Sequence, residues 1–413
     1  MFDAKQSPLK ARRDYTLLLV SQFLSVFGDN FILMLILGPF LKQFEAGKIT
    51  AEVQSVAIIF YTSLLFMPCV LLAPLAGYLN DRFSKNYWLA GGNLIKLVGA
   101  VLIWLGQISA SAWLGIGYFT IGIGVCFYSP ARYGILPEIL PAERLVKANG
   151  LMQALTIIAI LTGNIGGSAA FGRASLGICY LTGIGVYGLS LALSLLMSHT
   201  PAYPEVRLRG SLRQFFSNMA DLFSQKRLTL ILIGTALFWI CGAILKMNFQ
   251  PWGQQVLRLT SMLQISLLGL WLSVGIMIGS VSAGLIYAVG ELHVTRLYGW
   301  LLAAGIAALG SMRWLIGHGL KYSNVAAPAV LILTGVFAGL FLIPLNAALQ
   351  AESRKDRLGK TIATQNGFEN LAMLGGCLLA FIDVKAGLNP SEIFLALAVF
   401  AAIVGSRLKI PAK

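Results

Sequence analysis

The sequence predicts an all-α membrane protein with twelve transmembrane helices arranged as two six-helix halves. Of its 413 residues, 57% are hydrophobic and only 11% are charged, whereas a soluble domain has about 25% charged residues. Long apolar runs recur along the whole chain, and each approaches the roughly 20 residues that a helix needs to cross a bilayer. The alternating segments of about 10 residues that are typical of transmembrane barrels are missing. These observations indicate a polytopic helical membrane protein.

Twelve membrane spans are expected from the apolar runs. In chain order they cover residues 15–41, 54–79, 87–107, 111–129, 147–170, 176–197, 229–256, 264–288, 295–316, 326–350, 360–382 and 391–407. A polar segment at 199–227 follows the sixth span, and apolar spacing between 212 and 223 predicts an amphipathic helix on the inner membrane surface. The expected domains are an N-terminal six-helix bundle at 1–198, a cytoplasmic linker at 199–228 and a C-terminal six-helix bundle at 229–413.

The net charge of +15 comes from 31 Lys and Arg against 16 Asp and Glu. In a soluble protein this excess would suggest nucleic acid as a partner. In a membrane protein it is better explained by the cytoplasmic loops, which collect basic residues. With the spans above, 22 basic residues fall on the side that holds both termini, and seven fall on the opposite side. Both termini are therefore expected in the cytoplasm, and nucleic acid is not an expected partner.

The two halves also contain similar segments at corresponding positions. Residues 128–154 and 343–373 each run from a Pro at the end of a span, through a basic loop, to an Asn-Gly pair. The pairs are Asn149-Gly150 and Asn366-Gly367. Two parallel six-helix halves predict such a repeat, and the alternative is chance similarity, because Asn-Gly and Pro are common at helix ends.

The loop after the second span, GYLNDRFSKNYW at 77–88, resembles the signature of the major facilitator superfamily. In that family the Asp lies at a helix end and pairs with basic groups as a latch on the inside. The resemblance places Asp81, Arg82 and Lys85 in this latch, and Arg132, in the segment after the fourth span, is assigned to gating with them. The alternative is a solvated loop with ordinary basic residues.

Four ionisable residues lie at membrane depth: Asp29, Lys96, Lys246 and Glu369. At 1.5 Å per residue, Asp29 and Lys246 lie about 21–26 Å from the inner surface. In the superfamily fold the first and seventh spans line one cavity, so the two charges are expected to face each other. They could bind a zwitterion, with Asp29 and its neighbour Asn30 on an ammonium or hydroxyl and Lys246 on a phosphate or carboxylate. They could instead form a gating ion pair or be packing residues; Lys96 is interpreted as structural.

The span 360–382 carries a polar face. It contains Gln365, Asn366, Glu369 and Asn370 within two turns, and the last three share one side of the helix. Lipid cannot satisfy such groups, so the face must point into the bundle or a wet cavity. Substrate binding and interhelical hydrogen bonding are both consistent with this pattern.

Several chemistries are excluded by missing motifs. The chain has no GxxxxGK[ST] phosphate loop, and none of its three histidines has an Asp five residues later, as the acyltransferase pattern requires. The five cysteines fall inside apolar runs without metal-binding spacing. The sequence therefore predicts neither an enzyme nor a nucleotide-driven pump, and no cofactor or metal site.

Several segments together resemble the bacterial lysophospholipid transporters, the LplT family. They are QFLSVFGDN, YSPARYGILPEI, LVKANGLMQA, LFW at 237–239, IPLNAALQ and QNGFEN. The resemblance implies movement of lysophosphatidylethanolamine and lysophosphatidylglycerol from the outer to the inner leaflet of the bacterial inner membrane. Asp29 and Lys246 hold the family's acidic and basic positions, but the family usually has Arg at the second. Lys lacks the bidentate fork of Arg, so phosphate geometry is expected to be less strict.

The resemblance also implies partners. The product would be reacylated by a separate acyltransferase/acyl-carrier-protein synthetase, and the chain is expected to act as a monomer. Two other functions stay open: an exporter of amphiphilic drugs in the same superfamily, and a non-transporting membrane partner of the acyltransferase. The fourth span lacks the internal Arg that is usual in proton-coupled drug exporters, which disfavours the first of these.

Overall fold

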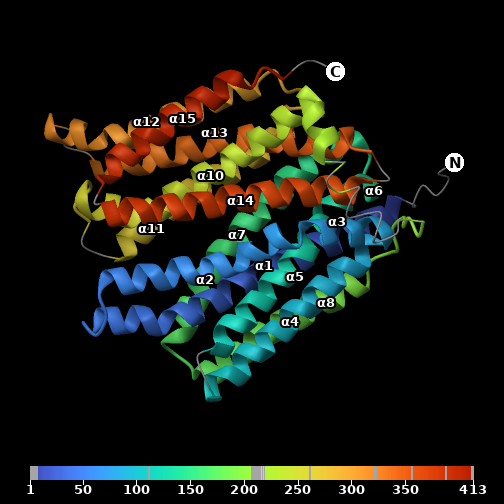
Figure 1. Ribbon diagram of the computed structural model, residues 1–413, viewed down its shortest axis with the longest axis horizontal. Coiled ribbons are helices and arrows are strands. Elements are labelled where there is room, and N and C mark those ends of the chain that lie inside the picture. Colours follow the sequence, from blue (N-terminus) through green and yellow to red (C-terminus); the bar gives the residue numbers. More distant parts are fainter. Residues whose placement is uncertain are drawn as a thin grey trace. The chain divides into compact units, whose positions relative to one another are not determined.

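The computed structural model describes residues 8–109, 112–205, 215, 217, 219–259, 262–319, 323–354, 357–386 and 388–410. These residues form helices and connecting segments, and no strand occurs among them (Figure 1). The helices are α1 (Pro8–Glu45), α2 (Ala51–Leu71), α3 (Ala73–Arg82), α4 (Lys85–Ser109), α5 (Ala112–Gly134), α6 (Leu136–Ile139), η1 (Ala142–Arg144), α7 (Leu145–Phe171), α8 (Leu176–Leu195), α10 (Lys226–Gln255), α11 (Met262–Ile286), α12 (Thr295–Gly317), α13 (Ser323–Glu352), α14 (Leu358–Ala386) and α15 (Pro390–Arg407).

The predicted all-α membrane fold is confirmed. Within the described residues, 11 helices are long and apolar enough to cross a membrane. The remaining expected span, 360–382, corresponds to α14, whose first half carries the polar face. The expected span 54–79 is broken at Leu72 into α2 and α3. Pro74 explains the break, because it has no backbone N–H and its ring clashes with the preceding turn.

The described chain divides into two compact units. The first contains residues 1–141, 158–220 and 353–370, and the second contains 142–157, 221–352 and 371–413. The first unit therefore includes the beginning of α14, and the second includes the beginning of α7. The two units do not follow the domain bounds expected from the sequence, 1–198, 199–228 and 229–413, and those bounds stay a prediction.

In the first unit, α4 lies against both α5 and α8 (Figure 1). Glycines allow α4 and α5 to approach closely: a Cβ at Gly99 would lie 2.6 Å from the carbonyl oxygen of Gly117, and a Cβ at Gly117 would lie 2.7 Å from that of Gly99. Apolar side chains of α1, α2, α4, α5 and α8 fill the core, with Leu35, Ile103 and Tyr118 fully buried. This packing fixes the helices that carry Asp29 and Lys96.

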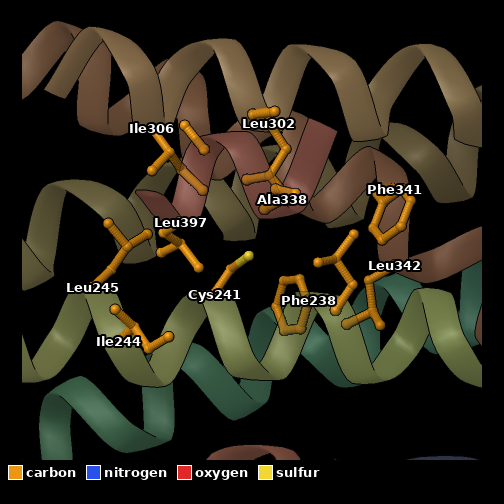
Figure 2. Packing of buried hydrophobic residues seen from close by; sticks show 14 of the residues in the cluster. Phe238, Cys241, Ile244, Leu245, Leu302, Ile306, Ala338, Phe341, Leu342 and Leu397 are labelled. Atoms are coloured by element: carbon orange, nitrogen blue, oxygen red, sulfur yellow. The ribbon is translucent and has the colours of Figure 1, made fainter. Parts of the chain in front are cut away.

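The second unit has its own core between α10, α12, α13 and α15. Figure 2 shows Phe238 and Cys241 of α10 facing Leu302, Phe341 and other apolar side chains of this cluster. All five cysteines are buried and free, and no metal-binding group of His, Cys, Asp or Glu occurs in the part of the chain that the structure describes. The amphipathic helix predicted at 212–223 lies partly outside the described residues; positions 215, 217 and 219–224 are helical.

The internal repeat has a different register from the one expected. Asn149 is the fifth residue of α7, whereas Asn366 is the ninth residue of α14, so the Asn-Gly pairs are not equivalent. The equivalent segments are RLVK at 144–147 and RLGK at 357–360, because α7 begins at Leu145 and α14 at Leu358. In each unit a glycine packs on the backbone of this Lys. A Cβ at Gly284 would lie 2.9 Å from the Cα of Lys147, and one at Gly77 would lie 3.0 Å from that of Lys360.

Candidate functional site

Asp29 lies on α1 and is held by two neighbouring helices of the first unit. Its Oδ2 accepts a hydrogen bond from the Nζ of Lys96 on α4 at 2.8 Å, and its Oδ1 accepts one from the hydroxyl of Tyr187 on α8 at 2.8 Å. The Asp29 residue is only 5% exposed. Lys96, which was interpreted as structural, is thus the ion-pair partner of Asp29 within this unit.

A chain of buried polar side chains extends from this ion pair. Lys96 also donates to Ser25 at 2.8 Å, and the Ser25 hydroxyl donates to Asn93 at 2.8 Å. Asn93 in turn donates to Ser194 of α8 at 3.1 Å. This network ties α1, α4 and α8 together in apolar surroundings. Asn30, in contrast, donates to the carbonyl of Val26 in its own helix, at 2.9 Å.

Lys246 lies on α10 in the second unit and is exposed. Among the residues that the structure describes, its ammonium group has no hydrogen-bond or ion-pair partner, and the Cys377 thiol of α14 is its electrostatic neighbour. One turn earlier, a Cβ at Gly242 would meet nothing within 4 Å, so this side of α10 is open. Asp29 belongs to the other unit, and its predicted pairing with Lys246 stays a prediction.

The polar face of α14 meets α5 in the first unit. Asn366 donates from Nδ2 to the Ser129 hydroxyl at 3.1 Å. Gln365 donates from Nε2 to Glu369 Oε1 at 2.8 Å, while Asn370 donates to the carbonyl of Asn366 at 2.7 Å. Gln365, Asn366 and Glu369 are each 7% exposed. The sequence placed Asn366, Glu369 and Asn370 on one face without indicating a neighbour for them, and Ser129 was missed.

Arg132 and Tyr133 complete this cluster at the end of α5. The guanidinium carbon of Arg132 lies 4.4 Å from the centre of the Tyr133 ring. The Tyr133 phenol lies within electrostatic range of both Arg132 and Glu369. The Nε of Arg132 is buried and has no acceptor among the described residues. The sequence assigned Arg132 to gating and missed Tyr133, although the spacing of 129, 132 and 133 is typical of one helical face.

Asp81, at the end of α3, binds the N-terminus of α14. Its Oδ1 accepts from the backbone N–H of Gly359 at 2.7 Å, and its Oδ2 accepts from that of Lys360 at 3.3 Å. The Lys360 ammonium lies 3.5 Å from Oδ2. Burial raises the pKa of Asp81 to about 6, although Lys360 and Lys85 act in the opposite direction. The carboxylate thus satisfies two of the N–H groups that a helix beginning leaves without partners.

The other predicted latch residues have different partners. Arg82 donates to the carbonyl of Pro204 at 3.1 Å. Lys85 is buried and forms an ion pair with Glu138 of α6. Lys360 is therefore the basic side chain that contacts Asp81 directly, and the sequence did not single it out.

Comparison with known proteins gives a consistent result along most of the chain. The profile of the Major Facilitator Superfamily matches residues 18–377. The lysophospholipid transporter LplT of Photorhabdus laumondii is 35% identical over 373 residues, which is 89% of this chain and 88% of that protein. The LplT of Cronobacter sakazakii is 34% identical over 90% of this chain and 88% of its own length.

Solved structures share the fold at much lower sequence identity. The human organic anion transporter MFSD10 (TETRAN) superposes with a TM-score of 0.80 at 14% identity, covering 98% of this chain and 100% of that one. A bacterial homologue of the iron transporter ferroportin gives a TM-score of 0.72 at 16% identity, covering 96% of this chain and 99% of that one. At this identity the similarity establishes the fold alone.

Proposed function

Because this chain belongs to the major facilitator superfamily, and within it to the LplT family, we propose that it moves lysophospholipids across the bacterial inner membrane. Membership of the superfamily makes the chain a multi-pass membrane transporter and not an enzyme. The proposed substrates are lysophosphatidylethanolamine and lysophosphatidylglycerol, moved from the outer to the inner leaflet. The observation that carries this proposal is the 35% identity to an LplT protein over 89% of the chain.

The physical barrier for such a substrate is its headgroup. A lysophospholipid has one acyl chain, which can stay in an apolar environment throughout, and a charged head that hydrocarbon does not solvate. A transporter lowers this barrier by offering charged and polar side chains at membrane depth, where they are otherwise costly. The buried groups of α1, α5 and α14 and the ammonium of the exposed residue Lys246 are of this kind.

We propose two different roles for these groups, based on their contacts. The carboxylate of Asp29 already binds Lys96 and Tyr187, so we assign this pair to holding the first unit in shape. Lys246 has an open side chain about 20 residues from the start of α10, so we assign it to the phosphate of an incoming headgroup. Both termini are proposed to be cytoplasmic, and the chain is proposed to act as a monomer. An acyltransferase/acyl-carrier-protein synthetase on that side would consume the product.

Reconstitution tests the function directly. Purified protein is inserted into vesicles, labelled lysophosphatidylethanolamine or lysophosphatidylglycerol is added outside, and albumin then extracts whatever remains in the outer leaflet. Vesicles with the protein should lose extractable label faster than protein-free vesicles, while a labelled two-chain phosphatidylethanolamine with one chain short enough for albumin extraction should stay equally extractable in both. Equal extraction from both kinds of vesicle would refute the proposal and favour a non-transporting partner. Faster movement of an amphiphilic drug, with no movement of either lipid, would favour an exporter.

A further inference from the structure

Gly242, one turn before Lys246 on α10, leaves an open space beside the proposed phosphate ligand. A Cβ at this position would meet nothing within 4 Å. The other two glycines of α10 are different: a Cβ at Gly234 would lie 2.8 Å from a leucine of α13, and one at Gly253 would lie 3.2 Å from a leucine of α11. Those two glycines let neighbouring helices of the second unit pack closely, whereas no described residue comes close to this point at Gly242.

A glycine without a packing partner is unfavourable in the middle of a helix. It lowers helix stability relative to alanine, because its backbone loses more conformational freedom on folding. Gly242 is the seventeenth residue of the 30-residue α10, and its backbone is not in the left-handed region that favours glycine. Within the described residues, neither packing nor backbone conformation accounts for this glycine, so the open space itself is the reason to consider.

The space at Gly242 lies on the same side of α10 as Lys246, because residues four apart are neighbours on a helix surface. One edge of this side is closed by α14, since a Cβ at Gly376 would lie 3.0 Å from the Cβ of Ala243. Side chains on a helix lean toward its N-terminus. Lys246 therefore leans toward the turn that contains Gly242, and it does so without filling the space there.

The depth of this space fits the part of a phospholipid that follows the phosphate. Lys246 is the twenty-first residue of α10, about 30 Å from the start of the helix. The hydrocarbon core is also about 30 Å thick, so Lys246 lies near the boundary opposite the start of α10, which is the proposed outer side. A lipid with its phosphate at this boundary directs its acyl chain back toward the membrane centre. Gly242 lies about 6 Å from Lys246 in that direction.

We infer that Gly242 provides the space for the glycerol and the ester end of the acyl chain of a lysophospholipid whose phosphate binds Lys246. The inference rests on the proposed function and deepens it by naming a specificity-determining residue beside the charged one. The glycine does not attract the lipid; it keeps free the volume that the lipid occupies. A larger side chain at position 242 competes with the substrate for this volume, so its cost appears in substrate binding.

The test measures the initial rate of lysophosphatidylethanolamine transport against lipid concentration in vesicles, together with the melting temperature of each variant. Gly242→Leu should raise the half-saturating concentration about 5- to 150-fold, the cost of forcing extra methylenes into a filled space. Gly242→Ala adds one methyl group and should raise it less. The melting temperature of both variants should equal or exceed that of the wild type, because alanine and leucine favour a helix over glycine and no described side chain lies in the way.

Gly185→Leu is the matched control. Gly185 lies within α8 in the first unit, and a Cβ there would also meet nothing within 4 Å. Leucine at this position should leave the half-saturating concentration unchanged. An unchanged half-saturating concentration in Gly242→Leu would overturn the inference. A lower maximal rate at an unchanged half-saturating concentration would overturn it too, because it would show that Gly242 serves the approach of another helix during transport.

Gly242→Cys tests the same space with a small side chain, in case the leucine variant does not fold. The five native cysteines are buried, so a water-soluble thiol reagent should react chiefly at position 242. Lysophosphatidylethanolamine at about ten times its half-saturating concentration should slow this reaction about tenfold by mass action, and it should not slow the reaction of Gly185→Cys. Equal reaction rates at position 242 with and without the lipid would contradict the inference, as would a thiol that does not react at all.

The two proposals fail in different ways. If the wild-type chain moves no lysophospholipid, the proposed function is wrong, and the inference falls with it. If the wild-type chain moves the lipid, and Gly242→Leu is folded with the half-saturating concentration of the wild type, only the inference is wrong.

Discussion

The contact between Asp81 and the beginning of α14 should protect the backbone of that helix from solvent exchange. The first N–H groups of a helix have no partner within it, and the carboxylate of Asp81 supplies one for Gly359 at 2.7 Å and one for Lys360 at 3.3 Å. Replacing Asp81 by Ala removes both acceptors. The two backbone N–H groups could then form hydrogen bonds only with water. Water reaches this buried contact only when α14 separates from α3.

The size of this effect can be estimated from the contact. A hydrogen bond to a charged group contributes about 1.5–3 kcal/mol, which corresponds to roughly 10- to 150-fold faster amide exchange when it is lost. Asp81→Asn should give a smaller increase, because its amide keeps one oxygen to accept a bond. The measurement is hydrogen–deuterium exchange of peptides covering residues 357–364. The matched control is Asp14→Ala, since Asp14 is equally buried, at 1% exposed, but lies on α1.

Gly359→Ala tests the same contact from the other side. A Cβ at this position would lie 2.5 Å from Asp81 Oδ1 and 3.0 Å from Asn80, so α3 and α14 would have to separate. Alanine favours a helix over glycine by about 1 kcal/mol, and an isolated helix would gain stability. Faster exchange in this variant would therefore come from the lost contact and not from helix propensity. Unchanged exchange in both Gly359→Ala and Asp81→Ala would refute the reasoning.

Three further predictions follow from buried polar groups. Asp29→Asn or Lys96→Met should lower the free energy of unfolding by about 3–5 kcal/mol, because each leaves a buried charge without its partner. The double variant Asp29→Lys with Lys96→Asp should recover part of this lost stability, as measured by thermal unfolding. In the buried amide pair of Asn149 and Gln350, with bonds of 2.7 and 3.0 Å, each single change to Ala should cost about 1–3 kcal/mol and the double change less than the sum. The pKa of Asp81 is raised from 3.8 to about 6. The contribution of this group to the free energy of unfolding is therefore fully present below pH 3.8 and is lost as pH rises toward 6. The free energy of unfolding of Asp81→Asn should not show this decrease between pH 3.8 and 6.

The sequence could predict which charged residues lie inside apolar spans but not which of them meet. Asp29, Lys96, Lys246 and Glu369 stand out because charges inside apolar spans are rare. Helical periodicity then gives the face of each residue but says nothing of the neighbouring helix. The sequence paired Asp29 with Lys246 and interpreted Lys96 as structural, whereas the structure of the first unit gives a bond between Asp29 and Lys96 at 2.8 Å. The hydroxyl of Tyr187 could not be anticipated, because tyrosines are common in membrane spans.

For the predicted latch, too, the sequence did not indicate which groups contact one another. The motif at 77–88 drew attention to Asp81, which is buried in an interhelical contact; its role as a latch stays a prediction. The partners are backbone N–H groups of Gly359 and Lys360, and backbone groups carry no sequence signal. The register of the internal repeat was missed for a related reason. Asn-Gly pairs are conspicuous in the sequence, whereas the equivalent contacts depend on glycines that pack against the Cα atoms of Lys147 and Lys360.

The repeat, once placed in this register, shows that the two halves have kept the same backbone contact with different polar groups. Gly77 packs on Lys360 and is followed four residues later by Asp81, whereas Gly284 packs on Lys147 and is followed four residues later by Ala288. Lys360 is accordingly buried beside a carboxylate, and Lys147 is exposed. The beginning of α7 is bound instead by the uncharged Asn149 and Gln350 pair. Among the described residues of these two contacts, Asp81 at α14 carries a raised pKa, whereas the amide pair at α7 has no charge to lose, so a change of pH acts on the first contact and not on this pair.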